Sequence, residues 1–394
     1  MLFSPVSVFF GLANLVYAVL NLQLLKGLRN LTQGRRTDGK ADSPMGPTLP
    51  TVTVLIAARN EELRIPKCLD CLMSQDYDAR RLQIIIVDDR SDDGTASVLS
   101  AYCDRFPGRL TIRTLKETGR GFSPKKYALS RGLEEATGEI IVTTDADCIM
   151  SDGWISAIVS EFADDTGLVL GMTSYYALSG ETASSGTQAL EFLSYGIVAA
   201  GLVGLNFPVH GNANNIAYRR KVYNEAASFA SHGNIVSGDD DFLIQGIHKL
   251  GRWKIRYSVH PESQVQTEPP LSLGQFWEQR KRWASKCSLY EAKQTAFLAC
   301  IFAYYALIPI FMILGLYQAR YLALGLAGFG VKTGTDYLVM REGTATFSKK
   351  ELMRWFPITC LVHIPLIIAA VLAGSFGEFT WKGQRVRRKI KAAT

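Results

Sequence analysis

The chain has 394 residues, of which 47% are hydrophobic, and a formal net charge of +7. This length suffices for one large domain or two ordinary ones, and the composition excludes disordered and fibrous proteins. The basic residues lie mostly beside apolar segments, so a membrane surface is the expected anionic partner and nucleic acid is not. Seven scattered cysteines indicate a reducing compartment without a disulfide framework.

The first apolar segment runs from Val6 to Leu25, close to the roughly 20 residues that a membrane-spanning helix needs. Basic residues such as Lys26 and Arg29 follow this segment, whereas a secretory signal carries them in front. The positive-inside rule therefore predicts that the N-terminus faces outwards and that the following residues lie in the cytoplasm. Residues 1–28 are expected to form a membrane helix, and residues 29–50 a linker.

Residues 51–270 alternate between apolar, β-rich runs and segments with helical periodicity. This alternation predicts an α/β domain with a mainly parallel, twisted sheet that helices cover on both faces. The expected strands are Thr51–Ala57, Leu82–Val87, Leu110–Leu115 and Glu139–Thr144, and the expected helices are Glu61–Gln75, Asp93–Phe106 and Pro124–Ala136. No G-x-G-x-x-G or P-loop pattern follows the first strand, so a dinucleotide oxidoreductase or P-loop ATPase has little support.

Two acidic pairs directly follow predicted strands: Asp88 with Asp89, and Asp145 with Asp147. Ligands of open parallel sheets bind beyond the carboxyl ends of the strands, so both pairs are expected to face one crevice. The carboxylate oxygens of Asp145 and Asp147 suit Mg²⁺ or Mn²⁺, which also binds a diphosphate. For Asp145 and Asp147, the ordinary alternative is that they cap a helix or are simply solvated. Asp93 is equally suited to cap the helix that follows it.

A third acidic cluster, Asp239–Asp241, precedes an expected helix at Phe242–Leu250. One carboxylate there could cap the helix and interact favourably with its dipole, but three exceed what a cap needs. Placed near the first acidic pairs, one of them could be the general base that takes a proton from an attacking hydroxyl group.

The segment 271–292 carries basic and aromatic residues at helical spacing. Gln279, Arg282, Trp283 and Lys286 fall on one face at i, i+3, i+4 and i+7. This pattern predicts an amphipathic helix at the membrane interface, and the alternative is a set of anchors for the next membrane span.

Apolar character returns three times within residues 293–378, at Thr295–Leu316, Tyr321–Met340 and Phe356–Phe376. The middle segment carries Lys332 and Asp336, which favours a buried helix there. Three spans would place the basic tail, residues 379–394, outside and against the charge rule, whereas a re-entrant hairpin bent at Pro365 would keep it inside. The sequence leaves both arrangements open.

Ala189–Leu205 is also apolar, but it lies between the acidic pairs and the later clusters. If it crossed the bilayer, the acidic pairs and the later clusters would lie on opposite sides of the membrane. We therefore expect a buried or membrane-grazing helix, and Glu191 within it agrees with that expectation.

In the order and spacing of its motifs, the chain resembles the membrane-associated family 2 glycosyltransferases, which include cellulose and hyaluronan synthases and ceramide glucosyltransferases. The resemblance covers about Thr51 to Lys286. It rests on the stretches Val54–Glu61, Ile86–Thr95, Lys125–Leu129, Gly138–Asp147, Gly211–Arg219, Gly238–Asp241 and Gln279–Trp283.

The resemblance implies a GT-A fold and a single displacement from a UDP-sugar that inverts the anomeric centre. It implies a nucleotide site lined by Ala57, Asn60, Glu61, Asp89, Lys125 and Asp145. It makes Asp147, with Asp145, the ligand of Mg²⁺ or Mn²⁺. Its catalytic base aligns with Asp240, beside Asp239, with Asp241 as the alternative one residue away. Gln279, Arg282 and Trp283 would close over the diphosphate and the acceptor.

About four apolar segments are fewer than processive synthases usually carry. This favours an integral membrane enzyme, with its catalytic domain in the cytoplasm, that adds one hexose to a lipid hydroxyl. A polysaccharide synthase is the alternative within the same chemistry, and an aspartyl-phosphate phosphatase that uses Asp145 is a remote one. The sequence names neither the sugar, the acceptor nor the oligomeric state.

Overall fold

The computed structural model describes the backbone of residues 5–37, 49–117, 119, 123–176, 182–226, 239–381 and 384–387. Residues 38–48 of the expected linker, most of the basic tail and the side chain of Asp239 lie outside this description. The chain divides into two compact units. The sheet unit comprises Asn30–Ser179 and Val198–Pro269, and the helical unit comprises Met1–Arg29, Gly180–Ile197 and Pro270–Thr394.

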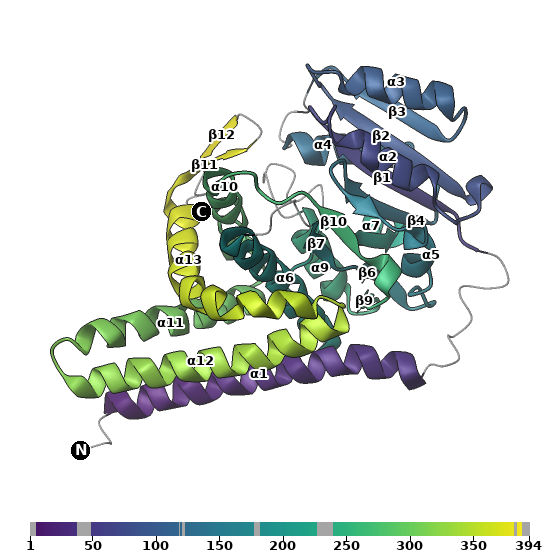
Figure 1. The fold of residues 1–394 in the computed structure, drawn as a ribbon. Helices are drawn as coiled ribbons and strands as arrows, with labels where there is room; N and C mark the ends of the chain where they lie inside the picture. The colour runs from purple at the N-terminus through teal and green to yellow at the C-terminus, as the bar shows by residue number, and fades with distance from the viewer. Residues whose placement is uncertain are drawn as a thin grey trace, which may run out of the picture. The chain divides into compact units, whose positions relative to one another are not determined.

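The sheet unit is built on a seven-stranded sheet with the strand order β3-β2-β1-β4-β8-β6-β9 (Figure 1). Its parallel half consists of β1 (Val52–Ala58), β2 (Leu82–Asp89), β3 (Leu110–Leu115) and β4 (Ile140–Asp145). The strand β8 (Ile216–Arg219) is antiparallel to β4 and to β6 (Thr166–Leu170), and β9 (Lys254–Tyr257) is parallel to β6. The four predicted strands are therefore confirmed to within two residues at their ends.

A smaller sheet and several helices complete the sheet unit. The small sheet has the order β5-β10-β7, from Ile149–Met150, Val265–Thr267 and Thr173–Tyr175. The helices are α2 (Ile65–Met73), α3 (Thr95–Arg105), α4 (Pro124–Leu133), α5 (Trp154–Val159), α7 (Arg220–Ala226) and α9 (Asp239–Leu250).

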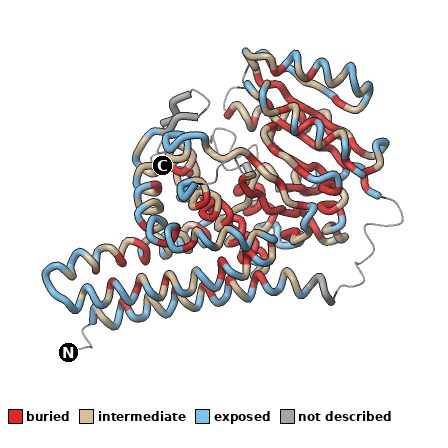
Figure 2. Tube along the Cα trace, in the orientation of Figure 1, coloured by how far each residue is buried: buried red, intermediate tan, exposed pale blue. Residues whose placement is uncertain are grey.

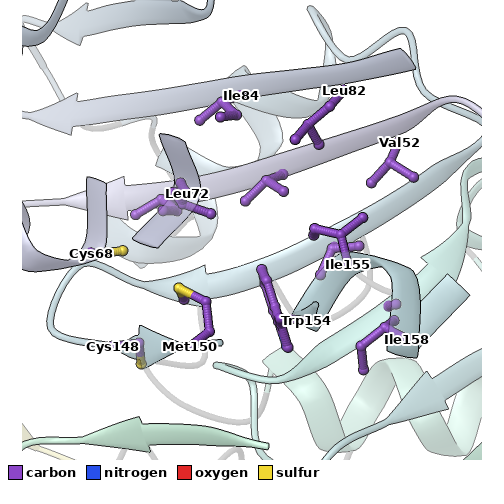
Figure 3. Packing of buried hydrophobic residues seen from close by; sticks show 14 of the residues in the cluster. Val52, Cys68, Leu72, Leu82, Ile84, Cys148, Met150, Trp154, Ile155 and Ile158 are labelled. Atoms are coloured by element: carbon purple, nitrogen blue, oxygen red, sulfur yellow. The ribbon is translucent and has the colours of Figure 1, made fainter. Parts of the chain in front are cut away.

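Alternating side chains of the central strands face different helices. Val54 and Ile56 belong to a core that includes Leu72 of α2 and Trp154 of α5 (Figure 3). Leu55, between them, faces the other way, towards Gly132 of α4, where an added Cβ atom would collide with it. Both faces of the sheet are therefore covered, which explains why the strands read as continuous apolar runs and are buried along their length (Figure 2).

The helix α2 begins at Ile65, four residues later than the sequence suggested. Pro66 lies in its first turn, and proline disfavours a helical conformation in the residue before it. Asn60 has a φ of 55°, so the chain turns after β1 instead of continuing directly into the helix. Glu61 consequently lies in a loop and not in a helix.

The helical unit contains the part of α1 (Pro5–Thr37) up to Arg29 and the first part of α6 (Ala183–Gly204). It also contains α10 (Leu273–Ala284), α11 (Ala292–Leu314), α12 (Ala319–Thr346) and α13 (Phe356–Phe376). Among the described residues, three helices are long and apolar enough to cross a membrane, at Pro5–Gln33, Ala292–Leu314 and Lys350–Phe376. Their exposed residues include many large apolar side chains, as expected for helices that face lipid (Figure 2).

The helix α13 is one continuous helix that contains Pro365, and its ribbon bends between its two ends (Figure 1). A hairpin that reverses at Pro365 is therefore not what the chain forms. Proline removes one backbone hydrogen bond and bends a helix without ending it when the remaining turns are packed.

The apolar helices are joined by a buried polar cluster. Lys332 and Asp336 of α12 form an ion pair with an N–O distance of 2.9 Å, and Lys332 is 1% exposed. The Tyr17 hydroxyl donates a hydrogen bond of 2.6 Å to Asp336, and His363 Nδ1 lies 3.2 Å from Lys332 Nζ. Ionisable groups among apolar helices are costly unless paired, so this cluster links α1 and α13 to α12.

Candidate active site

The carboxyl ends of β1, β2 and β4 meet at one edge of the large sheet. Ala57 of β1 lies opposite Val87 of β2 on one side and Asp145 of β4 on the other. Asp88 and Asp89 are the last two residues of β2. This register places both predicted acidic pairs at the same edge of the sheet, as the sequence indicated.

Asn60 connects the loops that follow β1 and β2. Its side-chain amide donates a hydrogen bond of 2.6 Å to Asp92, and its carbonyl oxygen accepts one of 3.0 Å from the Asp92 backbone N–H. Its own backbone N–H donates to the Ser91 hydroxyl oxygen at 3.0 Å. An asparagine tolerates the positive φ at this position better than most residues, and the paired loops form a preorganised wall of the site.

Two further acids of the second loop have defined partners. Arg90 lies against Asp89, with its Nε 2.8 Å from one carboxylate oxygen. Asp93 accepts hydrogen bonds from the backbone N–H groups of Thr95 and Glu62, at 3.0 and 3.2 Å. Burial opposes ionisation of Asp93, but a hydrogen bond from the Thr95 hydroxyl and these backbone bonds outweigh it and hold its pKa below the usual value. The helix α3 has Gly94 at its N-cap and no side-chain cap, so Asp93 stabilises the turn before the helix and does not cap it.

The pair Asp145 and Asp147 lies beside one lysine. Lys125 Nζ is 2.6 Å from Asp145 Oδ1, and the Thr267 hydroxyl donates a hydrogen bond of 3.1 Å to Asp147 Oδ2. Burial, and then the negative charges of Asp145 and Glu61, raise the pKa of Asp147 to about 6 against the effects of Thr267 and Lys125. The neighbouring acids therefore affect Asp147 more strongly than Lys125 does, which is an electrostatic environment that a cation stabilises.

No group of three histidine, cysteine, aspartate or glutamate side chains is arranged to hold a metal ion in the part of the chain that the structure describes. Mg²⁺ is commonly held by only one or two carboxylates, with water and substrate phosphates completing its shell. The two carboxylates of Asp145 and Asp147 therefore fit a divalent cation that binds together with a diphosphate, and do not fit a site closed by protein alone.

The structure adds residues that the sequence did not single out. Arg64 forms an ion pair with Glu268, lies 3.5 Å from Glu61, and has its pKa raised by the Glu268 hydrogen bond. Thr267 and Glu268 end β10 and follow it directly, and the charge of Asp147 also acts on Arg64. The only sequence signal was a polar pair before Pro269, which is too weak to identify a site.

The acidic cluster at the start of α9 holds a neighbouring loop. Asp241 is fully buried and accepts a hydrogen bond of 3.2 Å from the Gly211 backbone N–H. In the same loop, the Ala213 carbonyl accepts a hydrogen bond of 2.9 Å from Thr143 of β4. Asp240 is 8% exposed and accepts a hydrogen bond of 2.9 Å from the Asp241 backbone N–H.

The start of α9 also contacts the N-terminal turn of α4. Lys126 Nζ lies 5.3 Å from the ring centroid of Phe242, the residue after Asp241. The preceding residue, Lys125, reaches Asp145. The consecutive residues Lys125 and Lys126 thus contact the acidic edge of the sheet and the start of α9, respectively.

The remaining predicted residues, Gln279, Arg282 and Trp283, lie on α10 in the helical unit. The Trp283 ring stacks on Phe192, with 5.8 Å between ring centroids, and meets Tyr195 edge-on at 5.4 Å. The Ser272 side chain caps the helix by accepting a bond of 3.2 Å from the Gln275 N–H. The helical conformation of this segment is confirmed, and its closure over a nucleotide stays a prediction.

Comparison with known proteins gives a consistent result. The family model described as "Glycosyl transferase family 2" matches residues 53–226, and the one described as "Glycosyl transferase family group 2" matches residues 140–373, more than half of the chain. Together with the mainly parallel sheet, these matches confirm the predicted GT-A fold class.

Among curated proteins, the beta-monoglucosyldiacylglycerol synthase of Synechocystis is 26% identical over 367 residues, which cover 84% of this chain and 70% of that protein. A probable glycosyltransferase of Bacillus subtilis is 26% identical over 255 residues, covering 60% of this chain and 55% of that protein. Among solved structures, a mannosyltransferase of Pyrobaculum calidifontis in complex with GDP-Man and Mn²⁺ is 19% identical, covers 91% of this chain and 98% of that chain, and has a TM-score of 0.49.

Proposed function

Because the chain belongs to glycosyl transferase family group 2, we propose that it moves one hexose from a UDP-sugar to a hydroxyl group of a membrane lipid. The observation that carries this proposal is the pair of carboxylates Asp145 and Asp147 beside Lys125, where burial and neighbouring negative charge raise the pKa of Asp147. In the part of the chain that the structure describes, three helices are also apolar enough to cross a membrane. The relative named beta-monoglucosyldiacylglycerol synthase supports a lipid acceptor and addition of one sugar.

The loops after β1 and β2 would bind the nucleoside. In this proposal Ala57, Asn60, Glu61 and Asp89 line the uridine site. Lys125 and Asp145 lie beside the phosphates. A divalent cation, Mg²⁺ or Mn²⁺, held by Asp147 with Asp145 would neutralise the charge that develops as UDP leaves.

Asp240 is our proposed general base. Its carboxylate would take the proton of the acceptor hydroxyl while that oxygen bonds to the anomeric carbon and the bond to the UDP phosphate oxygen breaks. Asp240 is 8% exposed whereas Asp241 is 0% exposed, which supports Asp240 over its neighbour. Asp239 stays in the proposed catalytic set on its sequence position alone.

The helix α10 would supply the other binding groups. A guanidinium group and an amide N–H are suited to diphosphate oxygens, so Arg282 and Gln279 are assigned to the leaving group. Trp283 would provide an apolar surface for the acceptor. In the proposed domain arrangement, residues 271–292 lie at the bilayer interface and residues 51–270 face the cytoplasm.

Product analysis tests the proposal. The purified protein, in vesicles that contain diacylglycerol, ceramide or a polyprenol, is incubated with UDP-glucose, UDP-galactose, UDP-N-acetylglucosamine or GDP-mannose, and the products are analysed by mass spectrometry. The proposal predicts a lipid that carries one sugar from a UDP donor. Lengthening sugar chains would instead identify a polysaccharide synthase, and the absence of a lipid-linked sugar with every donor would contradict the proposal.

A further inference from the structure

We propose that Glu191 and Arg280, which lie outside the predicted site, are positioning residues for Gln279 and Trp283. This inference rests on the proposed function, because the orientation of α10 affects activity only if Gln279 and Trp283 bind the substrates. Arg280 would act through its neighbours and not on the substrate. The observations that carry the inference all lie within the helical unit.

The two side chains form a fully buried ion pair between α6 and α10. Glu191 and Arg280 are each 2% exposed. Arg280 Nε lies 2.9 and 3.1 Å from the two Glu191 oxygens, and Nη2 also bonds to Oε2. The Tyr195 hydroxyl donates a fourth bond, of 3.0 Å, to Glu191. The pair therefore has the fork geometry and the additional hydrogen bond that a buried pair needs.

Arg280 also fixes the side chain of Gln279. Its Nη1 donates a hydrogen bond of 2.5 Å to Gln279 Oε1. Because the amide oxygen accepts this bond, the amide NH₂ group at the opposite end of the side chain is set as the donor. A donor is what a phosphate or hydroxyl oxygen requires, so Arg280 determines which end of Gln279 is offered to a substrate.

Aromatic rings complete the positioning of Trp283. The Arg280 guanidinium carbon lies 4.4 Å from the Trp283 ring centroid and 4.3 Å from that of Phe276. Phe192 and Tyr195 of α6 contact the same tryptophan. The guanidinium is held both by Glu191 and between rings, so a shift of the ion pair would also shift Trp283.

The charge of Arg280 is already neutralised by Glu191, which separates its role from that of a phosphate ligand. The next cation, Lys281, pairs with Glu278 at 2.5 Å and donates to the Glu378 carbonyl at 3.1 Å. In the proposed function Arg282 is the residue assigned to the diphosphate. The consecutive basic residues Arg280, Lys281 and Arg282 are therefore assigned different roles.

The part of α6 that carries Glu191 is itself anchored to the other helices of the unit. A Cβ atom added to Gly343 of α12 would collide with Ile197, and one added to Gly186 would collide with the Trp355 ring. Side chains that pack this closely against a glycine backbone leave little freedom for sliding. Glu191 thus fixes α10 against an element whose own position is set by α12 and by the turn before α13.

A double variant separates positioning from stability. Removing one member of a buried ion pair is strongly destabilising, whereas replacing both with apolar side chains is often neutral. We compare Glu191→Gln, Arg280→Met and the double variant Glu191→Leu/Arg280→Met by thermal unfolding and by kcat and KM for donor and acceptor. Glu278→Gln, which removes the Lys281 pair on the same helix, is the matched control.

The double variant is expected to unfold near the wild-type temperature while kcat falls about 100-fold, the scale of a misplaced catalytic group, with little change in either KM. The control should retain the wild-type kcat. A double variant with wild-type kcat would show that the pair is only structural and would overturn the inference. If the double variant does not fold, Arg280→Lys is tested instead, because lysine keeps the charge but lacks the bidentate guanidinium group. A lowered kcat then supports the inference, and an unchanged kcat overturns it.

Hydrogen exchange keeps this inference separate from the proposed function. If the wild-type protein transfers no sugar to lipid, the proposed function fails. Exchange of the α10 amides in Arg280→Lys then still reports on positioning: faster exchange at an unchanged unfolding temperature supports it, and wild-type exchange overturns it.

Discussion

Charged groups have different surroundings inside the helical unit and at the edge of the large sheet. In the helical unit, Glu191 is matched by Arg280 and Asp336 by Lys332, each within hydrogen-bonding distance. In the sheet unit, Asp147 is half-buried beside other acids, and its pKa is raised to about 6. Matched pairs connect elements of the fold, whereas an excess of one sign is the mark of a site that a ligand completes. The comparison supports our proposals that substrate binds at the sheet edge and that the paired groups align the binding residues.

The largest effect on sugar transfer is expected from removal of the Asp147 carboxylate charge. Asp147→Asn should reduce sugar transfer at least about 1000-fold, because cation stabilisation of the leaving group supplies several kcal/mol. Its unfolding temperature should not fall, since repulsion from Asp145 and Glu61 is relieved. Transfer assays, Mn²⁺ titration in the presence of UDP, and thermal unfolding measure these outcomes. A variant with wild-type transfer and wild-type Mn²⁺ affinity would remove Asp147 from the site.

The second-largest effect is expected from loss of the proposed general base, Asp240. Asp240→Asn should reduce kcat about 10²- to 10⁴-fold, the range for loss of general base catalysis, while UDP affinity stays unchanged. Steady-state kinetics and calorimetric UDP binding check the two parts. An Asp240→Asn protein that keeps the full transfer rate would falsify the base assignment.

Breaking a matched pair in the helical unit should affect stability first. Lys332→Met leaves Asp336 unpaired and is expected to cost about 3–5 kcal/mol, whereas Lys332→Met/Asp336→Leu should cost clearly less. Reversible unfolding in detergent measures the difference. Equal losses for the single and the double variant would show that the ion pair is not what links these helices.

The smallest expected effect is at the loop after β2 and depends on pH. Asp93→Ala should cost about 1 kcal/mol, the usual net value of a hydrogen bond. Since the folded pKa of Asp93 lies below its unfolded value, this stabilisation is present at neutral pH and is lost as the pH falls through the folded pKa. Glu62, the other carboxylate at this turn, is present in both proteins. Unfolding free energies of wild type and variant should therefore converge in acid, and a constant difference down to low pH would contradict a stabilising role for the Asp93 carboxylate.

The sequence predicted the strands and the acidic edge because both depend on local patterns. Apolar runs of the right length give β1 to β4, and in parallel strands the residue after each run must lie at the carboxyl edge, where Asp88 and Asp145 are found. The loop position of Glu61 was predictable in principle from Pro66, but the helical periodicity around it outweighed that signal.

Long-range ion pairs were beyond prediction. Arg64 and Glu268 are 204 positions apart, and Glu191 and Arg280 are 89 positions apart. No periodicity links such partners, because they meet only after the sheets and helices have packed. Within the sequence, Arg280 was one basic residue among three, and only burial distinguishes it from Lys281 and Arg282.

The central claim is that the excess charge at the sheet edge binds a nucleotide diphosphate through a divalent cation. An experimental structure of the protein with UDP and Mn²⁺ tests it most directly. Our account predicts the metal between Asp147 and the diphosphate, with Lys125 beside the phosphates and Gln279 and Arg282 bound to their oxygens. A nucleotide bound elsewhere, or a diphosphate held without Asp147, would contradict it.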